Sequence, residues 1–333
     1  MDILSKIKEK AKANRCRIVL PEGGDARIIK ASRSIVDQSI ADITIIGGLE
    51  ALKKEFSDMA DRVDIMDPDS DDRIGAYIDD FYEMRKHKGV TRDDAKKLLL
   101  ENSVYIAAMM ARRGEADGFV AGASYTTRNV ARAAIQCIGV DKEMGVVSGA
   151  FIMALPDKKF GDDGIFIFAD CAIVPDPNAR QLSSIAISAA DLLKCLLSIE
   201  PRLAMLSYST KGSGAGDSVD KVREATESVK ALRPDILIDG EFQVDAAIDP
   251  GVCGIKAPDS PLKGRANILI FPNLDSGNIA CKLTQRLAGA KAIGPVLQGL
   301  KKPASDLSRG CDSEDVVNTV SVIAAMAKCG VSK

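Results

Sequence analysis

Short apolar runs alternate with longer amphipathic segments along the first part of the chain. The runs are rich in Val, Ile and Phe, which is typical of β-strands, and they lie at 16–24, 42–48, 61–68 and 117–123. The segments between them carry apolar residues at helical spacing, and we predict helices over 1–15, 25–38, 70–87, 92–113 and 126–139. The segment 92–113 is predicted as one long helix.

The pattern starts again near residue 145. Two apolar runs, 145–156 and 163–173, flank a charged turn and predict an antiparallel pair of strands. Beyond them we predict helices and strands in alternation, at 179–199, 203–208, 218–232, 235–239, 244–255, 266–271, 275–288, 291–298 and 313–329. Such alternation predicts an α/β fold with mainly parallel sheets flanked by helices on both faces. Because one core rarely serves more than about 250–300 residues, we expect two domains.

Composition excludes several classes of protein. Lys plus Arg is 45 and Asp plus Glu is 47, a formal net charge of -2, so a nucleic-acid partner is not expected. No apolar run approaches the ~18 residues of a membrane span, and the N-terminus lacks the apolar core of a signal peptide. We therefore expect a soluble, cytoplasmic protein without a membrane partner. The eight cysteines include no C-x-x-C motif, which disfavours zinc ribbons and thioredoxin-type redox sites.

The single histidine, His87, limits the chemistry further. A Ser-His-Asp site needs a histidine base, and a zinc site of clustered histidines needs more than one. His87 lies in a charged stretch and is interpreted as a solvated side chain. Activation of a nucleophile would then depend on a carboxylate, a lysine or a group of the substrate.

The stretch before the last helix offers the clearest candidate site. Ser308, Arg309 and Gly310 form a polar loop that leads into that helix, and Asp315 falls in its first turn. Backbone N–H groups at a helix start attract anions, and an arginine beside them binds a phosphate or an oxyanion. The same residues also have a purely structural interpretation, in which Asp312 or Ser313 caps the helix and the acidic residues of the first turn interact favourably with the helix dipole.

Two other basic positions have the same ambiguity. Arg85 is followed by more cations at a predicted helix end, where positive charge stabilises the helix dipole. Arg128 and Arg132 share a face of the helix that follows a strand, and the carboxyl ends of parallel strands are where open α/β sheets bind ligands. Each arginine either binds an anion or is simply exposed.

Two further motifs favour no cofactor. The Gly-rich turn at 207–217 matches neither the dinucleotide fingerprint nor the P-loop. Two interpretations of this turn stay open, namely close packing of the backbone and close approach of a bulky anionic ligand. The acidic residues Asp239, Glu241, Asp245 and Asp249 either hold Mg²⁺ with a substrate or cap the helix that follows.

Six stretches in order resemble the phosphate acetyltransferase family over essentially the whole chain, in its short form. They are FYEMRKHKG, ADGFVAG with VARAAIQ, LSYSTKGSG, DGEFQVDAA, ANILIFPNLDSGNIACKL and GPVLQGLKKPASDLSRGC. The resemblance implies a two-domain α/β enzyme with its active site in the cleft between the domains. The fold is then similar to that of the isocitrate and isopropylmalate dehydrogenases, without nicotinamide. The last strand and helix return to the first domain, so we expect domain I at 1–144 plus 296–333 and domain II at 145–295.

The resemblance also implies an activity and a set of site residues. The reaction is reversible acetyl transfer between coenzyme A and phosphate in acetate metabolism, by direct attack of the CoA thiolate in a ternary complex. The enzyme is expected to be a homodimer with no bound cofactor or metal. The family's catalytic residues match Ser308, Arg309 and Asp315, its phosphate-binding arginines match Arg85 and Arg132, and its CoA-binding positions match Arg27, Lys256 and Lys282. Phosphate butyryltransferase, a dehydrogenase of similar fold and a non-catalytic module that binds CoA or phosphate are the alternatives.

Overall fold

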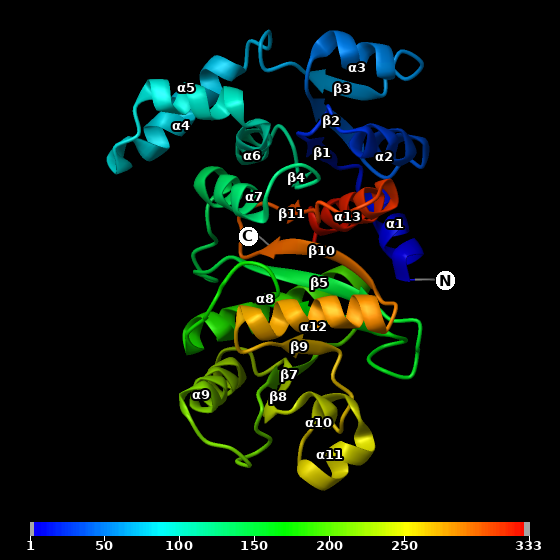
Figure 1. The fold of residues 1–333 in the computed structure, drawn as a ribbon, viewed down its shortest axis with the longest axis vertical. Coiled ribbons are helices and arrows are strands. Elements are labelled where there is room, and N and C mark those ends of the chain that lie inside the picture. Colours follow the sequence, from blue (N-terminus) through cyan, green and yellow to red (C-terminus); the bar gives the residue numbers. More distant parts are fainter. Residues whose placement is uncertain (1–2, 330–333) are drawn as a thin grey trace. The chain divides into compact units, whose positions relative to one another are not determined.

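The computed structural model describes residues 3–329 and consists of two compact units (Figure 1). The first unit comprises residues 1–139 with 300–333, and the second comprises residues 140–299. The domain boundaries expected from the sequence, at 144 and 296, lie a few residues from these divisions. Each unit contains its own set of adjacent strands and its own covering helices.

The first unit has a parallel sheet of strand order β3-β2-β1-β4-β11. Its strands are β1 (Arg17–Leu20), β2 (Asp42–Ile46), β3 (Val63–Met66), β4 (Gly118–Ala121) and β11 (Ala304–Asp306). Most of their residues are buried, as expected where helices cover both faces of a parallel sheet. The strand β11 was not predicted, because its three residues have no apolar run.

Helices of the first unit cover both faces of this sheet (Figure 1). The helix α13 packs on α1 and α2 and contacts β1 and β4, while α6 contacts β1 and β4 and packs on η2. The bounds are α1 (Ile3–Asn14), α2 (Ala26–Asp37), α3 (Leu49–Glu55), α4 (Ile74–Arg85), η1 (Lys86–Lys88), α5 (Arg92–Glu101), α6 (Ser103–Arg113), α7 (Thr127–Ala133), η2 (Ala134–Ile138) and α13 (Ser313–Met326).

Three expectations about helices were wrong. The segment 92–113 is two helices, because Asn102 is extended (φ -143°, ψ 91°) and its side chain accepts a hydrogen bond from the Val104 N–H as the cap of α6. The segment 244–255 is also broken, at Asp249, whose side chain caps a new helix that begins at Pro250. The short helix α3 was missed entirely.

The second unit has the strand order β10-β5-β6-β9-β7-β8. Its strands are β5 (Ser148–Ala154), β6 (Ile165–Ala169), β7 (Arg202–Leu206), β8 (Leu237–Phe242), β9 (Ile268–Ile270) and β10 (Lys291–Gln298). The strand β5 is antiparallel to both β10 and β6, which confirms the predicted antiparallel pair, and the pairs β6–β9, β9–β7 and β7–β8 are parallel.

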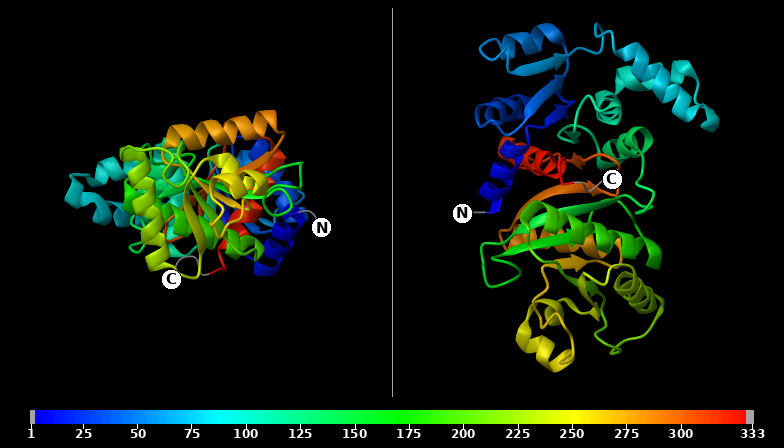
Figure 2. Two further views of the ribbon diagram at one scale, coloured as in Figure 1. Left: turned by 90° about the horizontal axis from the view of Figure 1, so that it is seen from below. Right: turned by 180° about the vertical axis from the view of Figure 1, so that it is seen from behind.

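Two long helices of the second unit lie on opposite faces of its sheet, α12 in front in Figure 1 and α8 in front in the right-hand view of Figure 2. The helices are α8 (Ala179–Leu197), α9 (Asp217–Leu232), α10 (Val244–Ile248), α11 (Pro250–Lys256) and α12 (Leu274–Leu287). Phe166, Phe168 and Phe271 form edge-to-face contacts in the core. Within residues 3–329, no helix has both the length and the apolar character that a membrane span requires.

Candidate active site

Three loops of the first unit meet at the carboxyl ends of β1, β4 and β11. The loop after β1 carries Glu22, the loop after β4 runs from Gly122 to Tyr125, and the loop after β11 runs from Leu307 to Cys311. These strands are parallel neighbours, so their carboxyl ends lie on one edge of the sheet. Ligands of open α/β sheets bind at this edge.

The buried carboxylate of Glu22 organises the loop after β4. It accepts four successive backbone N–H groups, from Gly122 (2.9 Å), Ala123 (3.1 Å), Ser124 (2.6 Å) and Tyr125 (3.1 Å). Hydrogen bonds to an ionised acceptor are stronger than neutral ones. The loop backbone is therefore held in one conformation by a residue about 100 positions earlier in the chain.

Arg27 ties all three loops together. Its guanidinium donates to both oxygens of Asp25, to the Ala123 carbonyl (2.7 Å), and to the carbonyls of Arg309 (2.8 Å) and Cys311 (3.0 Å). The hydrogen bonds from Arg27 lower the pKa of Asp25 to about 2. Arg27, expected from the resemblance to bind CoA, thus uses its donors on the protein in this structure, and it fixes the backbone of the Ser308–Arg309 loop.

That loop presents its polar side chains outward. Ser308 and Arg309 are both exposed, and the Ser308 hydroxyl accepts a hydrogen bond from the Gly310 N–H (3.3 Å). No hydrogen bond joins the Arg309 guanidinium to another described residue. An arginine held by its backbone, with its donors free, is suited to bind an oxyanion or a phosphate.

Asp315 lies in the first turn of α13 and is exposed. Its side chain accepts from the Asp312 N–H (3.1 Å), while Asp312 caps the helix by accepting from the Asp315 N–H (2.9 Å). This reciprocal pair is a capping box. The structural interpretation of these acidic residues therefore holds, and it places the Asp315 carboxylate at the same helix start to which the Ser308–Arg309 loop leads.

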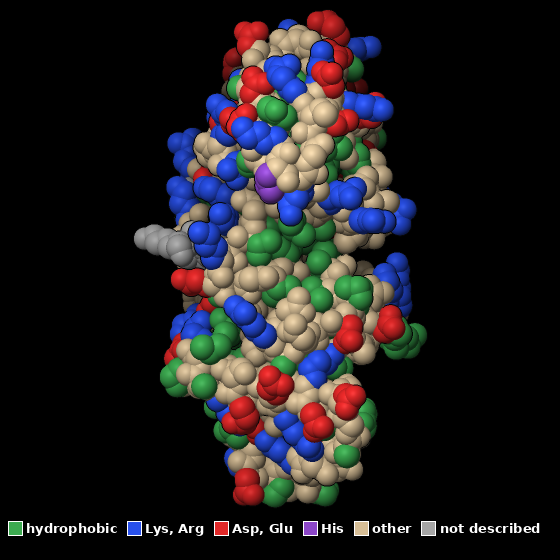
Figure 3. All heavy atoms as spheres, turned by 90° about the vertical axis from the view of Figure 1, so that its left-hand side faces the viewer, with side chains coloured by type: hydrophobic (Ala, Val, Ile, Leu, Met, Phe, Trp, Pro, Cys, Tyr) green, Lys and Arg blue, Asp and Glu red, His purple; other side chains and the backbone are tan. Residues whose placement is uncertain are grey.

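Arg85 and Arg132 both approach Tyr105. Burial raises the pKa of Tyr105 to about 12, and the positive charges of Arg132 and Arg85 oppose that rise. Arg132 is exposed on α7, and the Nε of Arg85 is buried without a hydrogen-bond partner in the described part of the chain. Two guanidinium groups from different helices thus act on one phenol, and together they form a candidate anion site. Figure 3 shows many Lys and Arg side chains, among acidic ones, on the face of the first unit that it presents.

The remaining predicted residues, Lys256 and Lys282, belong to the second unit. Lys256 donates to the Gln243 side chain (2.9 Å) and to Asp245 (2.7 Å), and Lys282 is exposed on α12. Arg128 is exposed as well.

The acidic residues near 239–249 are each engaged by the protein. Asp239 pairs with Lys211, Asp245 with Lys256, and Asp249 caps α11. Glu241 binds Arg223 (2.9 Å) and accepts from the Gly212 N–H (2.9 Å), so the Gly-rich turn closes over a carboxylate of the same unit. These contacts favour the capping and packing interpretations over a Mg²⁺ site.

A carboxyl group that sequence reasoning missed lies at the end of β11. Asp306 is 1% exposed, and burial and then the charge of Glu22 raise its pKa to about 7, while the Thr127 side chain and the charge of Arg309 oppose that rise. No signal in the sequence marks it, since its environment is made by β4 and the loop after β1. The acid next to Ser308 and Arg309 is thus poised between two protonation states near neutral pH.

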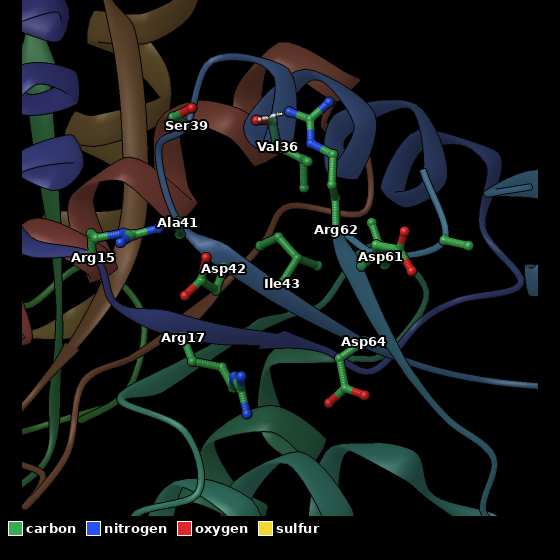
Figure 4. Close-up of a pocket in the computed structure, with 12 residues that line it drawn as sticks. Arg15, Arg17, Val36, Ser39, Ala41, Asp42, Ile43, Asp61, Arg62 and Asp64 are labelled. Atoms are coloured by element: carbon green, nitrogen blue, oxygen red, sulfur yellow. Dashed lines mark hydrogen bonds between the residues drawn. The ribbon is translucent and has the colours of Figure 1, made fainter. Parts of the chain in front are cut away.

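The cavity of Figure 4 lies elsewhere in the first unit. It has a volume of about 690 Å³ and is lined by residues at the amino ends of the strands, among them Arg17, Asp42 and Asp64. Arg62, on its wall, donates to the Val36 carbonyl (2.7 Å). Because Arg17 begins β1 and the Glu22 loop follows its end, this cavity is on the opposite edge of the sheet from the three loops.

The fold and this edge define an α/β protein with a candidate anion site, to which arginines and a helix start would contribute. The chain belongs to the family described as phosphate acetyl/butaryl transferase, whose model matches residues 2–325. A phosphate acetyltransferase of Thermoanaerobacterium thermosaccharolyticum is 46% identical to it over 98% of this chain and 100% of the relative. One from Clostridium acetobutylicum is 43% identical over 99% and 100%. The crystal structure of a phosphotransacetylase from Streptococcus pyogenes superposes with a TM-score of 0.91 at 40% identity, covering 98% of each chain.

Proposed function

We propose that this chain is a phosphate acetyltransferase, which exchanges acetyl groups reversibly between CoA and inorganic phosphate. The observation that carries the proposal is the Ser308–Arg309 loop, whose backbone is fixed by Arg27 while its polar side chains are free at the carboxyl edge of the sheet. The two relatives named as phosphate acetyltransferases match 98% and 99% of this chain, and they favour acetyl over butyryl transfer.

The chemistry assigns one task to each group. In the direction of acetyl-CoA synthesis the CoA sulfur attacks the carbonyl carbon of acetyl phosphate, and the C–O bond to phosphate breaks. Arg309 and the Ser308 hydroxyl stabilise the oxyanion, and Asp315 accepts the thiol proton as general base. Arg85 and Arg132 hold the phosphate, whose negative charge grows as it leaves.

Three buried thiols of this chain are poor candidates for an acyl intermediate. Cys16 and Cys311 are buried, and burial raises the pKa of each to about 11. Cys137 is buried too, and its pKa is raised by the same cause. Because the thiolate is the nucleophile, these groups are almost wholly unreactive at neutral pH. Direct attack by CoA needs no protein nucleophile.

We assign CoA binding to Lys256 and Lys282, with Arg27 acting through the loops that it holds. Substitution of Lys256 or Lys282 by Ala is expected to raise the KM for CoA and to leave that for acetyl phosphate unchanged. A change in both KM values would indicate that these lysines support the structure rather than bind CoA.

We also propose that the enzyme is a cytoplasmic homodimer. Three large apolar residues of α12 follow one another at helical spacing on the surface, Ile279 (57% exposed), Leu283 (52%) and Leu287 (82%). Such a stripe is typical of a subunit interface. Light scattering should give twice the chain mass, and Leu283→Asp should reduce it; a monomeric wild-type protein contradicts the assignment.

The activity is tested with purified protein, acetyl phosphate and CoA, by following thioester absorbance, and then with butyryl phosphate in place of acetyl phosphate. Faster transfer of acetyl than of butyryl is expected. Preference for butyryl would keep the mechanism and change the substrate. Binding of CoA or phosphate without any thioester would show a non-catalytic module instead.

A further inference from the structure

A buried acid beside the candidate catalytic loop has no task in the mechanism above. Asp306 ends β11, two residues before Ser308, and is 1% exposed. Its Oδ1 is buried and has no hydrogen-bond partner among the described residues. A buried acceptor left unpaired is unfavourable, so a position with only a packing role would favour an apolar side chain.

The surroundings of Asp306 are shaped to admit it. Gly122 lies against it with φ +114°, and a Cβ at that position would overlap both Asp306 Oδ1 and the Leu307 nitrogen. The Thr127 side chain is close enough to the carboxyl group to favour its ionised form. Two charged groups act on Asp306, namely Glu22 from the loop after β1 and Arg309 from the loop after β11.

These neighbours have opposite effects on the acid. Burial, and the negative charge of Glu22 next, raise the pKa of Asp306 to about 7, while the positive charge of Arg309 favours the ionised form. The attraction is mutual. An ionised Asp306 draws the Arg309 guanidinium toward the protein interior, and a neutral Asp306 does not.

We propose that Asp306 is a positioning residue for acetyl transfer, whose neutral form leaves the Arg309 guanidinium available to the substrate oxyanion. Asp306 touches no reacting atom, and its proton exchanges with solvent. The inference rests on the proposed function. It predicts that ionisation of Asp306 lowers turnover by holding Arg309 away from the oxyanion.

The test compares wild-type enzyme with Asp306→Asn, which is always neutral. Initial rates of acetyl-CoA formation from acetyl phosphate and CoA give kcat/KM from about pH 5.5 to about pH 9. Ionisation of the substrates is common to both enzymes, so the ratio of the wild-type kcat/KM to the variant kcat/KM isolates the effect of Asp306 ionisation. The ratio should be constant at low pH and should fall, by up to about tenfold per pH unit, above about pH 7. A ratio independent of pH overturns the proposal, and so does a ratio that rises with pH, which would make the ionised carboxylate a base.

Thr127 supplies a second, independent test if Asp306→Asn does not fold. Thr127→Val removes the hydroxyl that favours ionised Asp306, so the alkaline decline of kcat/KM should move to higher pH; Thr127→Ser keeps the hydroxyl and should leave the decline in place. Identical profiles for the two Thr127 variants overturn the proposal. A wild-type protein that makes no acetyl-CoA at any pH refutes the proposed function and the inference with it, whereas an active wild type with a constant ratio refutes only the role of Asp306.

Discussion

Replacing Asp306 by Asn should change how the stability of the protein depends on pH. The substitution keeps the shape of the side chain and removes its titration. In the folded chain, burial and then the charge of Glu22 raise the pKa of Asp306 from an ordinary value of 3.8 to about 7. Between these two values the folded protein keeps a proton that the unfolded chain has released.

The sign and size of the effect follow from proton linkage. Because the folded state binds the additional proton, the free energy of unfolding falls as pH rises, by about 1.4 kcal/mol per pH unit. The contribution is fully present below about pH 4 and fully lost above about pH 7, a total of roughly 4 kcal/mol. Between about pH 5 and about pH 8, the loss is about 2–3 kcal/mol.

Urea unfolding of wild type and Asp306→Asn, at about pH 5 and about pH 8 and equal ionic strength, measures this loss. All other titrating groups are common to both proteins, so the wild type should lose about 2–3 kcal/mol relative to the variant on going to the higher pH. Asp72→Asn, at an exposed position, tests whether loss of any carboxylate gives the same result. A difference that does not change with pH, or that favours the wild type at high pH, refutes the reasoning.

Three other substitutions separate catalysis from structure. Glu22→Gln places an amide NH₂ opposite two of the four backbone N–H groups from which Glu22 accepts hydrogen bonds. It should lower the free energy of unfolding in urea by about 2–6 kcal/mol. A loss below about 1 kcal/mol would show that the loop after β4 keeps its conformation without the carboxylate. Arg309→Ala should lower kcat about 10²–10³-fold without changing the melting midpoint, since its guanidinium forms no hydrogen bond to a described residue. A lower melting midpoint together with the lower kcat would assign Arg309 a structural role. Asn102→Ala removes the cap of α6 and should cost about 1 kcal/mol in urea, whereas Asn102→Asp should retain most of it.

Sequence patterns predicted the elements that are determined by residues within the same short segment of the chain. The strand β6 is apolar over its whole length and buried over its whole length, and the final helix was expected where α13 begins. The cap of α13 could be predicted because Asp312 and Asp315 stand at capping-box spacing. In each case the signal and the contacts that satisfy it lie within a few residues.

The parts that were missed depend on contacts between distant segments. β11 has three residues and exists because Ala304 and Ser305 pair with Phe119 and Val120 of β4. The burial of Asp306 follows from that pairing, and Glu22 acts on N–H groups that lie about 100 residues further along the chain. No periodicity or motif reports such contacts, so the carboxyl groups around the Ser308–Arg309 loop became visible only in the folded chain.

The structural and the catalytic interpretations of the last helix start are compatible, because they use different atoms. In the capping box, Asp315 accepts the Asp312 N–H through Oδ2, while no hydrogen bond within residues 3–329 engages Oδ1. One oxygen of Asp315 thus fixes the carboxylate at the end of the Ser308–Arg309 loop, and the other is free to accept a proton from the CoA thiol. A general base needs both a fixed position and an open acceptor, and the capping box supplies the first without removing the second.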